Sequence, residues 1–178
     1  MNYHNITYPD MNNGDGLRVV LWLSGCSHHC YNCQNPQTWD VNSGILFDES
    51  AKEELFRELE KDYISGLTLS GGDPLYEANL DGVLDLVNKF RLSLPNKSIW
   101  LYSGYEFTDF FFTPIWKASE IDNNTKRKQI ISRCTVMVDG RYIDSQRNPS
   151  KKWAGSDNQR VIDIRKSLEQ NKVILYCD

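Results

Sequence analysis

The chain has 178 residues, a length that suits one domain better than two, and 40% of them are hydrophobic, which is enough for a real core. The net charge is −4, from 20 basic and 24 acidic residues, and this balance argues against a nucleic-acid-binding protein with a basic face. The two dense basic runs, Lys126-Arg127-Lys128 and Lys151-Lys152, are expected at the solvated surface, with a docking patch as the alternative.

The first half of the chain alternates strand-like apolar runs with helical patterns. Residues 19–23 are apolar, β-branched and aromatic, which predicts a strand. Apolar residues at helical spacing over 50–63 predict a helix, with Ser50 and Glu53 as a capping box at its start. Residues 67–69 predict a second, short strand.

The second half continues the alternation. A helical stripe begins at Leu80 and ends near Pro95. Residues 106–133 form the least regular part, in which 122–124 indicate an exposed turn. Further strands are predicted by apolar runs at 99–102, 135–138, 161–164 and 173–176. Strands and helices in this order predict right-handed βαβ units, and therefore an α/β fold with a parallel sheet in a single domain over 1–178.

Four of the predicted strands end in a polar turn that contains glycine. Strands commonly end in glycine, so one such turn alone carries little information. In a parallel sheet or barrel, however, these turns lie together at the carboxyl ends of the strands, where ligands bind. The turns are Ser24-Gly25-Cys26, Ser70-Gly71-Gly72-Asp73, Ser103-Gly104-Tyr105 and Asp139-Gly140-Arg141.

The cysteines are not expected to form disulfides. Residues 1–16 are polar and lack a charged segment followed by an apolar run, so we expect a cytoplasmic protein, whose thiols stay reduced. Three of the five cysteines, Cys26, Cys30 and Cys33, lie in a C-x3-C-x2-C spacing. Three thiolates in one loop hold three irons of a [4Fe–4S] cluster, and the fourth iron is then open to a substrate.

Two other metal sites compete with this interpretation. A structural zinc site would use the same three cysteines with His28 or His29, but zinc sites usually pair two short clips, and a second clip is not evident. A ferredoxin-like electron carrier would need a fourth cysteine, and Cys134 and Cys177 lie far along the chain. Cys134 and Cys177 are most simply explained as small apolar residues at strand ends.

At these residues the chain resembles the radical S-adenosylmethionine superfamily, and within it the anaerobic ribonucleoside-triphosphate reductase activating proteins, which are glycyl-radical activases. The cysteine spacing with a downstream Ser-Gly-Gly-Asp-Pro is specific for the superfamily, and the similarity covers nearly the whole chain. The matching segments are Met1-Asn2-Tyr3, Gly25-Cys26 to Cys33, Asn35, Thr38-Trp39, Leu69-Ser70-Gly71-Gly72-Asp73-Pro74-Leu75, Tyr102-Ser103-Gly104-Tyr105, Val138-Asp139-Gly140-Arg141, Trp153-Ala154-Gly155-Ser156 and Asn158-Gln159.

The resemblance implies a partial (β/α) barrel of the radical SAM type. It implies that S-adenosylmethionine binds the open iron. The 71–73 turn would then meet the methionyl amino group, and the Asp73 carboxylate would suit this ammonium group as an acceptor. The 32–34 backbone would contact the nucleoside end. Ser103 and Asp139 are weaker candidates for ribose or methionine contacts. The cofactor-binding residues expected on this basis are Asn32, Cys33, Gln34, Gly71, Gly72, Asp73, Ser103 and Asp139.

The implied activity is reductive cleavage of S-adenosylmethionine to a 5′-deoxyadenosyl radical, which generates a glycyl radical on the large subunit of the anaerobic reductase. An electron donor such as reduced flavodoxin would serve the cluster. Two alternatives stay open at this point. One is a radical enzyme with another target, which would carry out pyruvate formate-lyase activation or a small-molecule reaction such as deazapurine ring contraction. The other is a zinc-stabilised interaction module.

Overall fold

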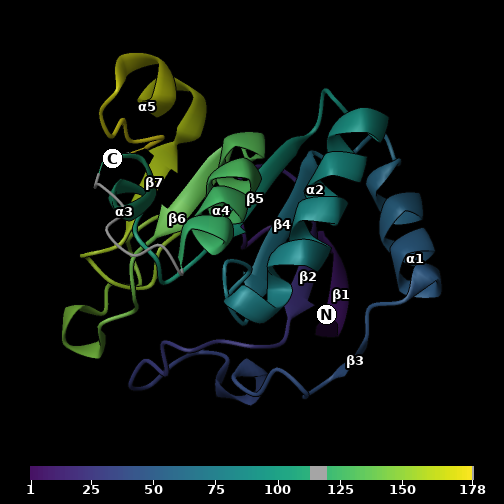
Figure 1. The fold of residues 1–178 in the computed structure, drawn as a ribbon, viewed down its shortest axis with the longest axis horizontal. Coiled ribbons are helices and arrows are strands. Elements are labelled where there is room, and N and C mark those ends of the chain that lie inside the picture. The colour runs from purple at the N-terminus through teal and green to yellow at the C-terminus, as the bar shows by residue number, and fades with distance from the viewer. Residues whose placement is uncertain (113–119, 178) are drawn as a thin grey trace.

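The computed structural model describes residues 1–112 and 120–177, which form a mixed α/β structure around one seven-stranded sheet. The strand order is β3-β1-β2-β4-β5-β6-β7 (Figure 1). The four central strands, β2, β4, β5 and β6, are parallel, whereas β1, β3 and β7 pair antiparallel at the two sides. The expected α/β fold with a parallel sheet is therefore confirmed for the centre of the sheet.

The strands are β1 (Asn2–Asp10), β2 (Arg18–Leu23), β3 (Ile45–Leu46), β4 (Gly66–Gly71), β5 (Ser98–Tyr102), β6 (Val136–Asp139) and β7 (Arg160–Asp163). The helices are α1 (Glu49–Leu59), α2 (Leu80–Ser93), α3 (Phe107–Phe111), α4 (Ile121–Arg133) and α5 (Ile164–Gln170). Three short 3-10 helices are η1 (Pro36–Thr38), η2 (Glu77–Asn79) and η4 (Asp144–Gln146).

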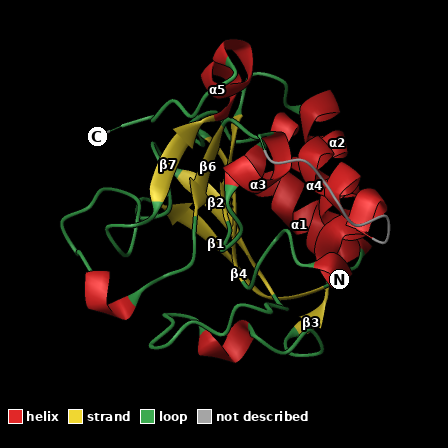
Figure 2. Cartoon of the chain, turned by 60° about the vertical axis from the view of Figure 1, so that its left-hand side comes forward, coloured by secondary structure: helices red, strands yellow, loops and turns green. Residues whose placement is uncertain are grey.

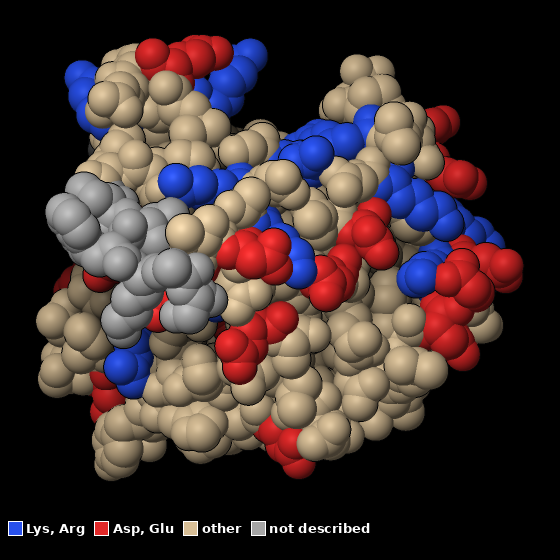
Figure 3. All heavy atoms as spheres, viewed as in Figure 1, with Lys and Arg blue, Asp and Glu red and all other residues tan. Residues whose placement is uncertain are grey.

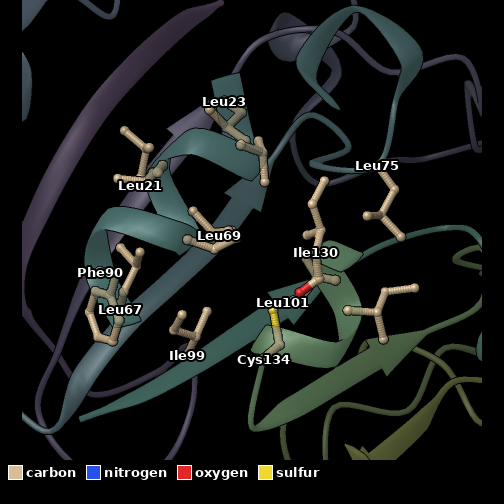
Figure 4. Close-up of a cluster of buried hydrophobic side chains, with 14 of the residues drawn as sticks. Leu21, Leu23, Leu67, Leu69, Leu75, Phe90, Ile99, Leu101, Ile130 and Cys134 are labelled. Atoms are coloured by element: carbon tan, nitrogen blue, oxygen red, sulfur yellow. Dashed lines mark hydrogen bonds between the residues drawn. The ribbon is translucent and has the colours of Figure 1, made fainter. Parts of the chain in front are cut away.

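One face of the sheet is covered by helices α1 to α4 (Figure 2), and we call it the helical face. Side chains alternate along a strand, so every second residue points to this face. Leu21 and Leu23 of β2 and Leu67 and Leu69 of β4 are fully buried there with Phe90 of α2 (Figure 4). The helical face therefore holds the main hydrophobic core.

The opposite face, which we call the loop face, has a different composition. The residues that point to this face include Trp22 of β2, Thr68 and Ser70 of β4, and Trp100 and Tyr102 of β5. These polar and aromatic side chains are covered by irregular segments and not by helices (Figure 2). The loop face therefore carries polar side chains beside an apolar cluster of Trp100, Val136, Val138 and Val161, whereas the helical face is apolar.

The strand β1 is not among the predicted elements. It pairs antiparallel with β2, but the register shifts between Tyr3 and Asn5 and again between Thr7 and Asp10. An extra residue at such a bulge interrupts the alternation of buried and exposed side chains. Tyr3 and Ile6 are the buried residues of β1, three positions apart, so the period-2 signal of a strand is lost.

Three local predictions are wrong. Residues 122–124 lie inside α4 and do not form a turn, because Asn124 is buried and accepts a hydrogen bond from the Arg127 guanidinium at 3.0 Å. Residues 173–176 make only a single bridge, between Ile162 and Leu175, in place of a strand. The first helix is capped by Asp48, whose side chain accepts from the Ala51 N–H at 3.0 Å, and not by the predicted Ser50. Of the irregular stretch 106–133, residues 113–119 lie outside the described residues.

The cap of α1 gives a test of that correction. Changing Asp48 to Ala is expected to lower the free energy of unfolding by about 1 kcal/mol, because the Ala51 N–H loses its acceptor. Changing Ser50 to Ala is the matched control and should leave stability unchanged or slightly higher, since alanine favours helix. Urea titrations of both variants make the measurement, and an equal loss in both would contradict the cap assignment.

The charged residues of the helical side are interspersed, with Lys and Arg beside Asp and Glu (Figure 3). The run Lys126-Arg127-Lys128 is not a solvated basic patch as expected. Lys126 pairs with Asp81 at 2.9 Å, and Arg127 is buried, donating to the Leu75 carbonyl at 2.9 Å. Among the described helices, none is long and apolar enough to cross a membrane.

Candidate active site

The four glycine turns meet at the edge of the sheet where the parallel strands end, which we call the carboxyl edge. The Asp73 N–H donates to the Gly25 carbonyl at 2.8 Å, which joins the turns after β2 and β4. The Gly104 N–H donates to the Asp73 carboxylate at 2.9 Å, which joins the turns after β4 and β5. The Gly140 N–H donates to the Tyr105 carbonyl at 3.3 Å, which joins the turns after β5 and β6. The predicted convergence of these turns is confirmed.

The loop after β2, residues 24–35, carries the three clustered cysteines and is called the cysteine loop below. Its start is tied down by backbone bonds, since the Cys26 N–H donates to the Trp39 carbonyl at 3.0 Å. The backbone has positive φ at His29 (46°) and Asn32 (53°). Alternating right- and left-handed conformations point successive N–H groups inward, a geometry found at many iron–sulfur sites.

Backbone donors are directed at two of the three sulfurs. The Asn35 N–H donates to Cys33 Sγ at 3.4 Å, and the N–H groups of His28 and His29 approach the Cys26 sulfur as donors. Burial, together with the nearby Asp73 carboxylate, raises the pKa of the Cys26 thiol to about 11, and the two N–H groups oppose that rise. The thiol is therefore protonated at neutral pH, and a metal that binds it must displace the proton.

This donor set fits a cluster better than it fits a single zinc ion. All three cysteines are free and half-buried, so none of them is committed to a disulfide. Within residues 1–112 and 120–177, no three His, Cys, Asp or Glu side chains are gathered as one ion requires. A cubane cluster holds its thiolates at separate corners, so the sulfurs need not meet at one point. Both loop histidines contact other groups: His28 lies against Asp73, and His29 stacks on Trp39.

Asp73 is the most heavily bonded side chain of the carboxyl edge. It is 2% exposed, and its carboxylate accepts from the Leu75 N–H at 2.8 Å, from the Ser103 hydroxyl at 2.9 Å and from the Gly104 N–H at 2.9 Å. Nε2 of His28 lies 2.9 Å from Oδ2, in a contact that is off the line of a hydrogen bond. The carboxylate is thus engaged by the protein's own donors.

The two weaker candidates, Ser103 and Asp139, are also engaged within the protein. The Ser103 hydroxyl donates to Asp73. Asp139 is 1% exposed and receives two bonds from the Arg160 guanidinium, at 3.0 and 2.6 Å, and one from the Phe107 N–H at 2.8 Å. Such bidentate pairs fix geometry. Both side chains therefore hold the carboxyl edge together.

A cavity of about 870 Å³ lies between the loop face, the cysteine loop and the segment after β6. Trp22, Ser70 and Tyr102 line it from β2, β4 and β5, and Cys33 and Gln34 line it from the cysteine loop. Its size is in the usual range for a small-molecule site. Two of the predicted site residues, Cys33 and Gln34, are thus cavity residues.

The third wall of the cavity is the segment 149–155, in which only Trp153-Ala154-Gly155 belongs to a predicted family motif, and that motif had no predicted role. Trp153 packs against Trp100 at the back of the cavity, with ring centroids 5.5 Å apart. Its indole N–H is buried without a partner among the described residues. In the sequence, this wall is signalled by the motif residues from Trp153 to Gln159. In the structure, the Gln159 side chain accepts a hydrogen bond from the Gly155 N–H at 2.9 Å.

Gly72 is required by the close approach of two turns. A Cβ placed there would lie 2.5 Å from the carbonyl oxygen of Gly25, which is backbone and cannot swing away. Changing Gly72 to Ala is expected to cost about 2 kcal/mol of unfolding free energy through overpacking. Gly155 to Ala is the control, because the nearest atom is in the Tyr142 side chain at 3.2 Å. Thermal melts of the apoproteins test this; equal losses in the two variants would contradict it.

Comparison with known proteins decides the family. A family model described as a 4Fe-4S single cluster domain matches residues 12–162. The anaerobic ribonucleoside-triphosphate reductase-activating protein of Enterobacteria phage T4 is 41% identical over 162 residues, which cover 90% of this chain and 93% of that protein. This chain belongs to the anaerobic ribonucleoside-triphosphate reductase-activating protein family.

Two bacterial members of this family show the same extent of similarity. The protein of Escherichia coli (strain K12) is 36% identical over 167 residues, 93% of this chain and 100% of that protein. The protein of Vibrio cholerae serotype O1 is 37% identical over 163 residues, 90% of this chain and 97% of that protein. The resemblance inferred from the motifs is confirmed, as are the class of activating enzyme and the [4Fe–4S] cluster as its cofactor.

Proposed function

We propose that this chain reductively cleaves S-adenosylmethionine to a 5′-deoxyadenosyl radical and thereby generates a glycyl radical on the large subunit of anaerobic ribonucleoside-triphosphate reductase. The name of its relatives gives the target. The observation that carries the proposal is the position of Cys33, which belongs to the cysteine loop and also lines the large cavity. A cluster held there would stand at the wall of a space large enough for S-adenosylmethionine.

In this proposal Cys26, Cys30 and Cys33 hold three irons, and the fourth iron is open. When bound, the cluster supplies the electron that breaks a carbon–sulfur bond of S-adenosylmethionine. The chain's own residues bind and orient the cofactor. The backbone of Asn32, Cys33 and Gln34 meets its nucleoside end, and Cys33 and Gln34 line the cavity.

The turn of Gly71, Gly72 and Asp73 meets the methionyl amino group. Because the Asp73 carboxylate already has donors of its own, we assign this contact to backbone carbonyl groups of the turn. The carboxylate then acts by keeping the turn in place. Ser103 and Asp139 support the site in the same way, through their bonds to Asp73 and Arg160.

The proposal includes a partial (β/α) barrel of the radical SAM type, in one domain over residues 1–178. It is supported by four parallel strands with helices on one face (Figure 2) and by the cavity that borders the other face. The segment 149–155 closes one side of the cavity, and the reductase would close another. Exclusion of water would then protect the radical from side reactions.

The electron donor in this proposal is a small redox protein such as reduced flavodoxin, and the place of action is the cytoplasm. The five free cysteines support a reducing compartment. Cys134 is buried and its thiol donates to the Ile130 carbonyl at 3.3 Å, as expected for a small apolar residue, and this supports the exclusion of a fourth ligand there.

The decisive experiment is an anaerobic assay with dithionite and reconstituted protein. Methionine and 5′-deoxyadenosine should form, and addition of the reductase should give the doublet of a glycyl radical in the electron paramagnetic resonance (EPR) spectrum. Absence of cleavage by protein with an intact cluster would overturn the proposal. A doublet with pyruvate formate-lyase and none with the reductase would reassign the target.

A further inference from the structure

Three of the four turns of the carboxyl edge, those after β4, β5 and β6, contact one residue of the cysteine loop, His28. Its Nε2 lies 2.9 Å from Asp73 Oδ2 in the turn after β4. Its ring lies against Gly104 after β5, where a Cβ would come within 2.4 Å of the ring, and edge-on to Tyr105 at 4.6 Å. Its carbonyl oxygen accepts from the Arg141 guanidinium after β6 at 2.5 Å. His28 is therefore held from three strands other than its own.

The backbone of His28 is directed at the predicted cluster ligand. Its N–H and that of His29 are the two donors that approach Cys26 Sγ. A shift of His28 would therefore change how these two donors meet the sulfur. Tyr105 adds a further contact, since its side chain hydrogen-bonds Ser27, the residue between Cys26 and His28.

The neighbouring His29 provides a contrast within the same loop. It is exposed, and its ring contact is with Trp39, which follows η1 and belongs to no turn of the carboxyl edge. The two histidines have the same side chain and adjacent positions, but only His28 connects the loop to β4, β5 and β6. If His28 acts through this connection, its replacement should have an effect that replacement of His29 does not have.

We propose that His28 is a positioning residue that keeps the amide donors on the Cys26 thiolate and so sets the reduction potential of the cluster. This inference rests on the proposed ligation by Cys26. Reduction adds one negative charge to the cluster, and N–H donors on a thiolate stabilise that charge. Loss of these donors makes the cluster harder to reduce, so its potential falls.

The test compares His28→Leu with the control His29→Asn in anaerobically reconstituted protein, because asparagine tolerates the positive φ of 46° at position 29. An EPR-monitored redox titration without S-adenosylmethionine measures the midpoint potential, and iron and sulfide analyses measure cluster content. At a fixed solution potential, His28→Leu should have a roughly tenfold lower ratio of reduced to oxidised cluster than the unchanged protein. For one electron this corresponds to a midpoint potential lower by about 59 mV. His29→Asn, which keeps the backbone N–H and removes the imidazole ring, should stay within about twofold of the unchanged protein. His28→Gln, whose amide nitrogen replaces Nε2, should recover part of the shift.

Equal shifts in His28→Leu and His29→Asn, or the absence of a shift in His28→Leu, would overturn the inference. Should His28→Leu fail to hold a cluster, Gly104→Ala takes its place, because the new methyl group pushes on the His28 ring and leaves the sequence of the cysteine loop unchanged. A lowered potential in Gly104→Ala supports the inference, and an unchanged one overturns it. A failure of the proposed function itself is distinguishable, because the unchanged protein would then lack a cluster or would not cleave S-adenosylmethionine.

Discussion

Changing Cys30 to Ala is expected to abolish both the visible absorption of the reconstituted cluster and the cleavage of S-adenosylmethionine. Cys30 lies in the middle of the C-x3-C-x2-C spacing, and its carbonyl accepts from the Cys33 N–H at 3.1 Å, which makes the turn between these two cysteines. Alanine keeps that backbone turn and removes only the sulfur. The loss should therefore be one of ligation, without loss of the fold.

The matched control is Cys177→Ala. Cys177 is also free and half-buried, but it packs against the cluster of Trp100, Val136, Val138 and Val161 on the loop face. This variant should retain iron, sulfide and cleavage activity at the level of the unchanged protein. Iron and sulfide analyses, absorption spectra and chromatography of 5′-deoxyadenosine make the comparison. Full activity in Cys30→Ala would refute its assignment as a ligand.

Changing Asp73 to Asn is expected to lower the free energy of unfolding of the apoprotein by about 3 kcal/mol. The carboxylate is buried and accepts from Leu75, Ser103 and Gly104. An amide in its place turns an NH2 group toward donors that then have no acceptor, and each buried donor left unsatisfied costs about 1–3 kcal/mol. Denaturant titration without cofactors measures the loss.

This variant separates two roles of Asp73 that the sequence leaves together. If the carboxylate served mainly to bind the ammonium group of S-adenosylmethionine, Asp73→Asn would leave the apoprotein stable and weaken only cofactor binding. The structure favours a structural role for the carboxylate, because the Leu75, Ser103 and Gly104 donors all bond to it. Asp144→Asn is the control, because that carboxylate accepts from the Tyr142 hydroxyl at the surface, and its change should alter stability by about 0.5 kcal/mol or less.

The central strands were predictable because their signal is local. The runs at β2, β4, β5 and β6 are apolar, and each is followed by glycine within a few residues. Strand β1 was not, because its bulges remove the alternation that a strand pattern depends on. Asn124 in α4 is a second residue whose structure the local sequence does not reveal. Its residue type favours turns, but a tertiary bond with Arg127 holds it in a helix.

The sequence by itself determined the chemistry of the site. The spacing of Cys26, Cys30 and Cys33 is a property of eight consecutive residues, and a short loop has few ways to arrange three sulfurs. The tertiary structure alone decided the partners of the polar residues around it. Asp73 meets Ser103 across 30 residues of chain, and Arg141 meets His28 across 113. Such contacts depend on the order of strands in the sheet, because the sheet brings distant turns to one edge, and a single sequence carries no local signal of that order.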